Sequence, residues 1–279
     1  MGGSGKTPAC LMIYYMLQQI KGLYKPAFLS RGYGRESRGS IRVNQSHSAR
    51  DVGDEALVLA DHGPAYVTEN RLEGAEMSLR DHIDCLILDD GYQSRQLAHD
   101  INILVINSFD GFGNKKLFPA GPLREPLQSG ISRADIILFI EDPRGIKINL
   151  RDYNMPAENI FTCKVKTKSD HIDKNQKFIA FTGIGRPDKF FESLKQEGFY
   201  LLDKKAYPDH HVYTDADFYE LEMMTKDTNV KFITTEKDFV KLSDNFKKNV
   251  YCLEISLEST QPGKLCQRLE YLLSSKEIA

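Results

Sequence analysis

Several features are scarce or missing in this 279-residue sequence, and each absence excludes a class of protein. The most apolar segments, such as 85–88 and 101–106, are far shorter than the roughly 18 residues needed to span a bilayer. The formal net charge is only −2, with 37 basic and 39 acidic residues mixed along the chain, which argues against nonspecific nucleic-acid binding. The first residues show no secretory signal pattern, so we expect a soluble protein that is not exported.

Cysteine is also sparse, and its spacing excludes two further classes. No C-x-x-C pair occurs, and the number of cysteines is odd. We therefore expect reduced, mostly buried thiols rather than a disulfide framework or a structural zinc site. The five cysteines are Cys10, Cys85, Cys163, Cys252 and Cys266.

Short β-rich apolar runs alternate with segments of helical spacing through the first half of the chain. These runs lie at 27–30, 65–68, 85–88, 101–106 and 136–140. Such alternation predicts a mostly parallel sheet with helices on both faces. We assign residues 1–150 to this first domain.

The pattern weakens after residue 141, and a second alternation of strands and helices begins near 177. We interpret 151–176, which contains a strand-like run at 160–165, as an interdomain connection. Residues 177–279 are expected to form a smaller α/β domain. Its closing helix at 261–274 has one leucine-rich face that could pack back on the first domain.

Residues 2–7 carry the strongest local signal, a glycine-rich run followed by a lysine and a threonine. In such a loop the backbone N–H groups approach phosphates, the lysine neutralises charge and the hydroxyl can bind Mg²⁺. The members of this candidate phosphate loop are Gly2, Gly3, Ser4, Gly5, Lys6 and Thr7. A glycine turn that caps a helix is the alternative. The amphipathic spacing that follows, up to Gly22, favours phosphate binding.

The phosphate loop also defines the expected fold. Combined with the alternating strands and helices, it predicts a P-loop NTPase-like α/β domain. The complete loop pattern would begin one residue before Met1, and the strand that feeds such a loop is missing. We therefore expect an N-terminal truncation.

Two acidic pairs are candidates for chemistry near the loop. Asp89 and Asp90 directly follow the apolar run at 85–88, where an open α/β sheet presents side chains to a ligand. Asp54 and Glu55 precede an apolar helical segment. Either pair could hold a metal or polarise an attacking hydroxyl, but turn formation and helix capping are equally simple explanations.

Two loops rich in glycine and arginine are candidates for binding anionic groups of the ligands. Arg31 and Arg35 lie in the loop after the first predicted strand, and Arg124 lies in a rigid proline-rich loop at 119–126. Their guanidinium groups suggest a phosphorylated acceptor in addition to ATP, although an exposed arginine is often simply solvated. The adjacent His210 and His211 point in different directions and make a poor joint metal site.

Taken together, these motifs closely resemble the tetraacyldisaccharide 4'-kinase family, the lipid A 4'-kinases of Gram-negative bacteria. The similarity runs nearly end to end in ordered motifs, which makes it far more specific than a phosphate loop alone. The motifs are GGSGKTP (2–8), SRGYGR (30–35), DVGDE (51–55), DDGYQ (89–93), NKKLFPAGPLREP (114–126), TGIGRP (182–187), DHH (209–211) and TTEKD (234–238).

This resemblance implies transfer of the γ-phosphate of ATP to the 4'-hydroxyl of a lipid-linked glucosamine disaccharide 1-phosphate, giving lipid IVA, with Mg²⁺ as cofactor. Asp54 would be the base for the sugar hydroxyl, oriented by His211 rather than His210. Lys6 and Asp89 join these two as candidate catalytic residues. Candidate metal ligands are Thr7, Glu55 and Asp90, and candidate substrate-binding residues are Arg31, Arg35, Gln93 and Arg124.

The resemblance also implies a monomer in peripheral contact with the cytoplasmic face of the inner membrane, without nucleic acid. One departure from the family pattern follows DDGYQ, where Ser94 stands in place of the histidine of many members. Two other hypotheses remain open at this point. They are a nucleotide-dependent switch or accessory ATPase, and a truncated kinase without activity.

Overall fold

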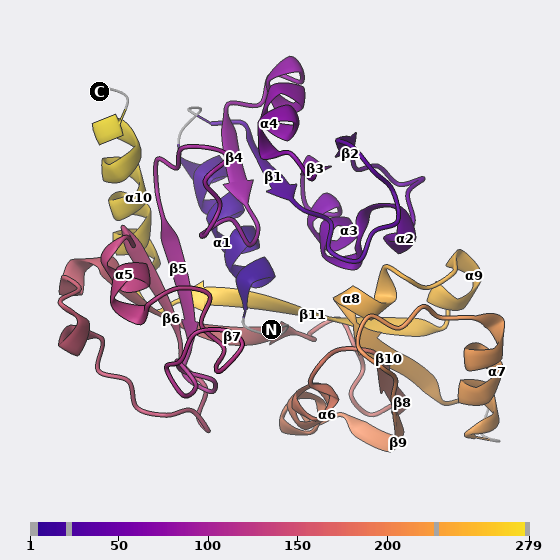
Figure 1. Cartoon of the computed structure of the whole chain (residues 1–279). Coiled ribbons are helices and arrows are strands. Elements are labelled where there is room, and N and C mark those ends of the chain that lie inside the picture. The colour runs from indigo at the N-terminus through magenta and orange to yellow at the C-terminus, as the bar shows by residue number, and fades with distance from the viewer. Residues whose placement is uncertain (1–4, 21–23, 226–228, 277–279) are drawn as a thin grey trace.

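The computed structural model describes residues 5–20, 24–225 and 229–276 and contains two sheets (Figure 1). The four-stranded sheet has the order β2 (Ile41–Arg42), β3 (Ala65–Val67), β1 (Pro26–Ser30) and β4 (Cys85–Leu88). The seven-stranded sheet has the order β5 (Ile103–Asn107), β6 (Ile136–Ile140), β7 (Ile160–Lys168), β11 (Val250–Ser259), β10 (Lys231–Thr235), β8 (Lys177–Thr182) and β9 (Tyr200–Ala206).

Strand pairing is parallel except at two places, β2 with β3 and β7 with β11. The parallel pairs require crossover connections, and helices supply most of them. The helices are α1 (Lys6–Gln19), α2 (Ala49–Val52), α3 (Asp54–Ala60), α4 (Arg71–Arg80), α5 (Leu127–Ser132), α6 (Pro187–Gln196), α7 (Asp215–Met223), α8 (Glu236–Phe239), α9 (Asp244–Lys247) and α10 (Pro262–Lys276), with short 3₁₀ turns at Leu150–Tyr153 and Ala157–Asn159. This confirms the predicted α/β fold class.

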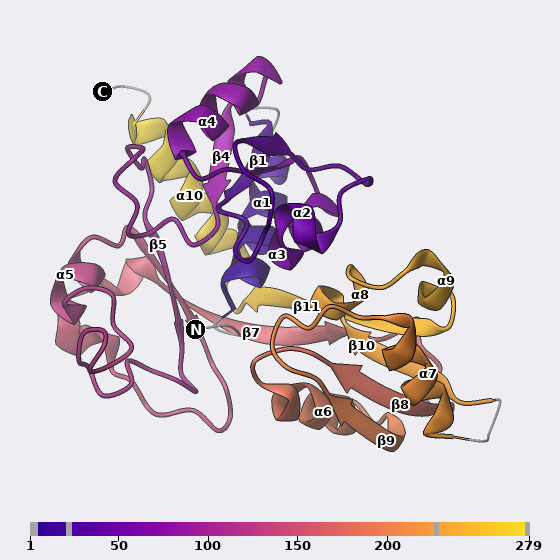
Figure 2. The same ribbon diagram turned by 45° about the vertical axis from the view of Figure 1, so that its right-hand side comes forward.

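The seven-stranded sheet runs through both halves of the chain. We call residues 5–20 and 24–159 with α10 the N-terminal lobe, and residues 169–225 and 229–249 the C-terminal lobe. β7 leaves the first lobe and β11 returns to it, and the two strands pair side by side over six residue pairs (Figures 1 and 2). The segment interpreted as a connection therefore contains a strand inside a sheet.

Helix α1 lies at the centre of the N-terminal lobe. Its apolar residues share one core with β6, β7 and the last helix, α10, whose Leu265, Leu269 and Leu272 are buried there. On its other side, α1 packs against β1, β3 and α3 through Leu11 and Tyr14. The helix that begins at the phosphate loop is thus fixed on two sides.

Most of the strands expected from the apolar runs are present to within a few residues. β5 begins at Ile103 rather than residue 101, because the Asn102 N–H donates to the carboxylate of Asp135 at 2.7 Å instead of joining the sheet. The sequence did not predict β2 or α4, which bury few apolar side chains. Gly22, the expected helix terminator, lies outside the described residues.

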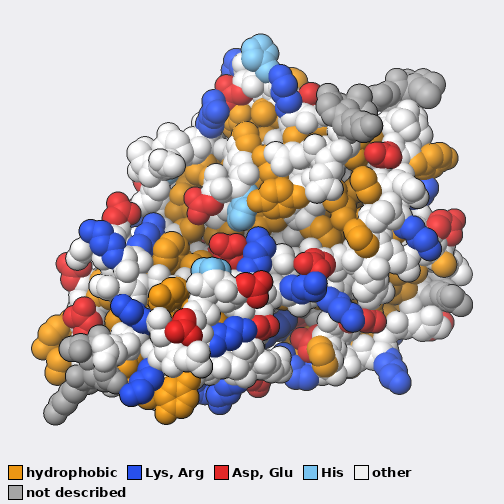
Figure 3. Space-filling model, turned by 180° about the vertical axis from the view of Figure 1, so that it is seen from behind, with side chains coloured by type: hydrophobic (Ala, Val, Ile, Leu, Met, Phe, Trp, Pro, Cys, Tyr) orange, Lys and Arg blue, Asp and Glu red, His pale blue; other side chains and the backbone are white. Residues whose placement is uncertain are grey.

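β4 and β5 are the edge strands at which the two sheets end. Ile87 of β4 and Val105 of β5 are half-buried and pack against the same core, beside α1. In a view from behind, hydrophobic side chains gather in the upper half of the molecule, while charged side chains predominate in the lower half (Figure 3). Within the described ranges, no helix combines the length and apolar character needed to cross a bilayer.

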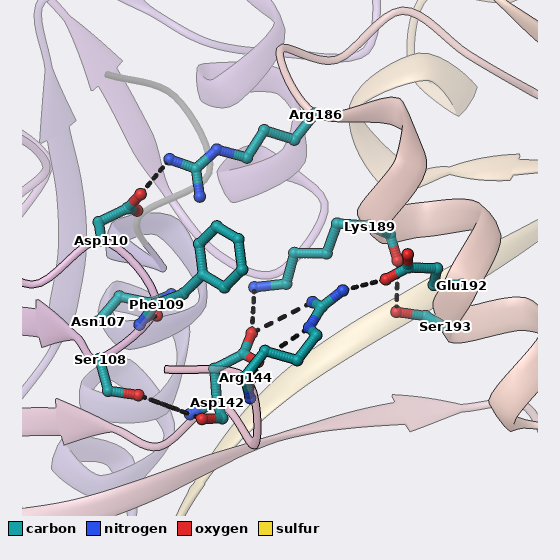
Figure 4. Close-up of polar contacts among 10 residues, drawn as sticks. All are labelled: Asn107, Ser108, Phe109, Asp110, Asp142, Arg144, Arg186, Lys189, Glu192 and Ser193. Atoms are coloured by element: carbon teal, nitrogen blue, oxygen red, sulfur yellow. Dashed lines mark hydrogen bonds and ion pairs between the residues drawn. The ribbon is translucent and has the colours of Figure 1, made fainter. Parts of the chain in front are cut away.

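A polar network joins the two lobes at the ends of β5, β6 and β8. Arg186, just before α6, pairs with Asp110, and Lys189 of α6 reaches Asp142 at 3.5 Å. Figure 4 shows these cations of the C-terminal lobe pointing at carboxylates of the N-terminal lobe. The Phe109 ring lies between the guanidinium groups of Arg144 and Arg186, each 5.2 Å from its centroid. The network ties α6 to loops of the other lobe.

We expect Arg186→Met to lower the free energy of unfolding by about 1–2 kcal/mol, because it removes a half-buried ion pair and a cation–π contact. Urea unfolding measures this change. The matched control is Lys166→Met, since Lys166 pairs with Glu258 across β7 and β11 but both side chains are more than half exposed. It should cost less than about 0.5 kcal/mol. Equal losses in the two variants would contradict the role given to the network.

Candidate active site

The described part of the phosphate loop is Gly5, Lys6 and Thr7; Gly2, Gly3 and Ser4 lie outside the described residues. Gly5 adopts φ 88°, and a β-carbon there would lie 2.3 Å from Cδ1 of Ile140. Only glycine fits this left-handed position against the end of β6. Thr7 is buried in the first turn of α1. The positive end of the α1 dipole therefore begins at the carboxyl edge of the sheet, where anions bind favourably.

Asp90 is held between two cations. Lys6 Nζ lies 2.8 Å from Oδ1 of Asp90, and the Arg124 guanidinium lies 2.8 Å from Oδ2. Burial alone would raise the pKa of Asp90, but the hydrogen bonds from Lys6 and Arg124 lower it to about 2. The backbone at Asp90 has φ 52°, and its carbonyl accepts a hydrogen bond from the fully buried Arg71 at 3.0 Å.

Its neighbour Asp89 is in the opposite situation. The side chain is only 3% exposed, and its Oδ1 has no hydrogen-bond partner. Burial and the negative charge of Glu55 raise the pKa of Asp89 to about 6, against the opposing charge of Lys6. The same burial, together with the Asp89 carboxylate, raises the pKa of the adjacent Cys10 thiol. Asp89 is therefore a buried carboxylate that any added cation would stabilise.

Asp54 and Glu55 open α3 close to the loop at 30–35. Gly53 has φ 90°, and a β-carbon there would lie 3.0 Å from the carbonyl oxygen of Tyr33. This close approach brings the two loops together. Asp54 is 6% exposed, and its Oδ1 accepts the backbone N–H of Glu55 at 2.8 Å.

The predicted partner of Asp54 was wrong by one residue. His210, not His211, lies against Asp54, with 2.9 Å between Nδ1 and Oδ2. His210 has a left-handed backbone, φ 58°, which turns its ring toward the N-terminal lobe and beside Tyr33. The pair joins the two lobes, as the sequence hypothesis required, but through the other histidine.

His211 belongs to the core of the C-terminal lobe. Its ring stacks on Tyr207, with centroids 4.6 Å apart and planes inclined by 17°. Its Nε2 lies 3.2 Å from a carboxylate oxygen of Asp217. These contacts hold His211 within the C-terminal lobe, while His210 is the histidine that contacts Asp54.

Lys237 is the residue that sequence reasoning missed. It lies in α8 of the C-terminal lobe and forms an ion pair with Glu55 of the N-terminal lobe. Burial opposes its charge, but the carboxylates of Glu55, Asp54 and Asp89 raise the pKa of Lys237. The sequence did contain a pointer to this lysine, because Lys237 belongs to the TTEKD motif that follows a predicted strand. The sequence analysis gave no role to the lysine itself.

The predicted substrate-binding residues separate into different environments. Arg35 is not directed at the site, because its guanidinium donates to the Gly39 carbonyl at 2.7 Å and its side chain is 4% exposed. It holds the loop at 30–40 together. Gln93 is exposed and donates to Glu125 at 2.9 Å. Arg31 is exposed and, among the described residues, pairs with no carboxylate.

Carboxylates and a hydroxyl are the oxygen donors that Mg²⁺ prefers, and Asp89 keeps a buried oxygen without a partner. The donor set of Thr7, Glu55, Asp89 and Asp90 therefore fits this ion. In the described part of the chain, no three acidic, histidine or cysteine side chains are yet gathered at a shared metal position. Instead, Glu55 forms an ion pair with Lys237, and Asp90 forms ion pairs with Lys6 and Arg124.

The fold and this edge of the sheet define a P-loop phosphotransferase: a phosphate-loop lysine, a buried acidic pair and a second acidic pair facing a histidine. Comparison with known proteins gives the family. The model of the family "Tetraacyldisaccharide-1-P 4'-kinase" matches residues 1–274, and the chain belongs to this family.

Similar proteins cover most of the chain. The tetraacyldisaccharide 4'-kinase of Gluconobacter oxydans is 36% identical over 98% of this chain and 83% of its own length. That of Paramagnetospirillum magneticum is 38% identical over 95% of this chain and 81% of its own. Among solved structures, an "apo" form of LpxK from Aquifex aeolicus in complex with ATP matches with a TM-score of 0.76 and 29% identity, over 98% of this chain and 85% of that one.

We expect stability to fall with pH through the titration of Asp89. Its carboxyl titrates at about pH 6 in the fold but near pH 3.8 as an unperturbed group, so the native state binds this proton more tightly. Its contribution to the free energy of unfolding is therefore present at low pH and is lost as pH rises through about 6.

Asp89→Asn should remove that loss. Relative to wild type, the free energy of unfolding of the variant should rise by roughly 2 kcal/mol between pH 4.5 and pH 7.5, measured by urea unfolding with a chelator present. A difference that stays constant over this range, or that shrinks as pH rises, would contradict the burial of an ionisable Asp89.

Proposed function

We propose that this chain transfers the γ-phosphate of ATP to the 4'-hydroxyl of a tetraacyldisaccharide 1-phosphate, forming lipid IVA in lipid A biosynthesis. Family membership supports the activity and the substrate class. The observation that carries the proposal is that one sheet edge gathers Lys6, both acidic pairs and a histidine from the other lobe.

Asp54 is the proposed base for the acceptor hydroxyl. One of its oxygens is held by the Glu55 N–H and the other faces His210, so the carboxylate has a fixed orientation. Asp54 would take the proton of the acceptor hydroxyl while the sugar oxygen attacks the γ-phosphorus of ATP. The bond between that phosphorus and the β,γ-bridging oxygen would break, and ADP would leave. His210 is a positioning residue that completes this arrangement only when the lobes are docked.

Charge neutralisation is the second requirement of phosphoryl transfer. Lys6 and Arg124 already converge on Asp90, and the triphosphate would compete with this carboxylate for both cations. Thr7, Glu55 and Asp90 would hold Mg²⁺, with Asp89 beside them, and the ion supplies neutralisation of phosphate charge. Lys237 would then exchange its contact with Glu55 for a phosphate oxygen.

Arg31 is the proposed contact for an anionic group of the acceptor, since it is exposed in the loop at 30–35, which approaches Gly53 next to Asp54. We also propose that the chain works as a monomer in peripheral contact with the cytoplasmic face of the inner membrane. These assignments rest on the family and on the exposure of the residues.

The direct test is transfer of labelled γ-phosphate from ATP to a detergent-dispersed tetraacyldisaccharide 1-phosphate. Label should appear on the lipid, and only in its presence. Release of free phosphate at the same rate without acceptor would instead identify an ATPase or nucleotide-dependent switch. Neither product, together with no ATP binding, would identify an inactive chain.

We expect Asp54→Asn to reduce kcat by about 10²–10⁴-fold, the range for loss of a general base. ATP affinity, measured by isothermal titration calorimetry, should change less than about threefold, because Asp54 touches the acceptor rather than the nucleotide. Lys6→Ala is the contrasting variant and should lose both ATP affinity and transfer. An equal loss of ATP affinity in Asp54→Asn would contradict its role as base.

The two histidines should separate cleanly. His210→Gln should lower kcat by tenfold or more with little change in the unfolding free energy, since His210 is half-exposed and acts on Asp54. His211→Gln should mainly destabilise the C-terminal lobe, because it removes a buried stacking contact and the Asp217 pair. Parallel kinetics and urea unfolding of both variants provide the comparison, and the reverse pattern would restore the original assignment to His211.

A further inference from the structure

The loop at 113–124 lies between β5 and α5 (Figure 1), and two of its large apolar side chains are exposed to solvent. Phe118 is 80% exposed and Leu117 is 45% exposed. Every residue from 113 to 120 is exposed. Of the large hydrophobic side chains in the described ranges, none is more exposed than Phe118. We call residues 113–124 the apolar-tip loop.

This exposure is built into the backbone. Phe118 N–H donates to the Leu123 carbonyl at 2.8 Å, and the Leu123 N–H returns a bond to Lys116 at 3.1 Å. The Gly121 N–H closes the tip by donating to the Leu117 carbonyl at 3.0 Å. Five residues of the loop are thus tied to one another, and these bonds fix the shape in which the tip presents Leu117 and Phe118.

Side chains reinforce the same shape. The Asn114 amide donates to the Ala120 carbonyl at 2.8 Å, and its carbonyl oxygen accepts the Lys116 N–H at 3.1 Å. Gly121 completes the fit, because a β-carbon there would lie 2.1 Å from Oδ1 of Asn114. A rigid loop that holds a phenylalanine in water has a cost in free energy with no benefit to the fold.

The charge around the tip is basic. Lys115 and Lys116 directly precede the apolar pair and are exposed. Within the described part of the chain, neither lysine forms an ion pair. An apolar tip with adjacent unpaired lysines matches the boundary of an anionic bilayer, where apolar side chains enter the acyl region and ammonium groups meet headgroup phosphates.

The loop is also joined to the active site. Arg124, at its end, contacts Asp90 at 2.8 Å, and Asp90 contacts Lys6 of the phosphate loop. A surface engaged at the tip is therefore one short, rigid segment away from the phosphate-binding edge. This continuity favours a membrane over a protein partner, because the proposed acceptor is itself a lipid.

We propose that the apolar-tip loop inserts Phe118 and Leu117 into the headgroup boundary of an anionic membrane, with Lys115 and Lys116 on the lipid phosphates. The choice of a lipid surface as the partner rests on the proposed function. The observation that the tip is exposed, rigid and basic is independent of that function. Docking here would present the active-site edge to an acceptor that stays in the bilayer.

The experiment uses a feature of the composition: the chain contains no tryptophan. Phe118→Trp therefore provides a single fluorescent reporter at the tip. The matched control is Tyr219→Trp on α7, which is 65% exposed and lies in the C-terminal lobe. Vesicles of phosphatidylcholine with 30% phosphatidylglycerol are titrated into each variant, without ATP or acceptor.

The Phe118→Trp emission should shift to the blue by about 10 nm or more and should be quenched by brominated acyl chains, while Tyr219→Trp should show neither effect. Absence of both effects at Phe118→Trp would overturn the proposal. A blue shift that needs no vesicles and grows with protein concentration would also overturn it, since it would place a second copy on the loop.

Vesicle sedimentation of the full chain measures the contributions separately. Phe118→Ser should weaken partition into vesicles by about tenfold or more. Lys115→Gln and Lys116→Gln should each weaken partition by about fivefold, and these two effects should appear only when phosphatidylglycerol is present. Equal partition of wild type and Phe118→Ser would contradict insertion.

Phosphate transfer to acceptor in detergent distinguishes this proposal from the proposed function. Phe118→Ser should retain kcat there, while KM should rise for acceptor presented in vesicles. Vesicle insertion without any transfer would leave the loop assignment standing and overturn the kinase assignment. Phosphate transfer in detergent without vesicle insertion would support the kinase assignment and overturn the loop assignment.

Discussion

The site depends on compensation of negative charge. Asp54, Glu55, Asp89 and Asp90 lie at one sheet edge, where carboxylates in a region of low dielectric repel one another strongly. Lys6 and Arg124 neutralise Asp90, and Lys237 neutralises Glu55. Burial and the charge of Glu55 raise the pKa of Asp89, which has no direct cation partner among the described residues, whereas the hydrogen bonds from Lys6 and Arg124 lower the pKa of Asp90. Each cation comes from a separate element, so the acidic edge can persist only in the assembled fold.

This compensation couples the site to the arrangement of the two lobes. Lys237 and His210 belong to the C-terminal lobe, while their partners Glu55 and Asp54 open α3 of the N-terminal lobe. The network around Asp142 joins the same lobes at a second place, and the β7–β11 pair joins them covalently and through the sheet. Under the proposed mechanism, docking of the two lobes would also assemble the Asp54–His210 pair.

Sequence reasoning located the residues whose positions follow from strand ends. Asp89 and Asp90 follow β4 directly, and Lys6 opens the helix beside it, so local pattern and the geometry of parallel sheets placed them at one edge. The sequence favoured His211 over His210, and this choice was wrong because the direction of the ring depends on a single left-handed backbone angle at His210. The roles of Lys237 and Arg35 could not be predicted because they depend on tertiary packing. α8 docks on α3, and the loop at 30–40 folds around the Arg35 guanidinium.

The proposed mechanism requires the lysines and the arginine at this edge to exchange their carboxylate partners for a magnesium-bound triphosphate. The most direct measurement is a crystal structure of the full chain with Mg²⁺ and a non-hydrolysable ATP analogue. The account predicts the triphosphate against Lys6, with the ion on Thr7 and the acidic edge, and Lys237 withdrawn from Glu55. A triphosphate bound elsewhere, with the Lys6–Asp90 and Lys237–Glu55 pairs intact, would contradict it.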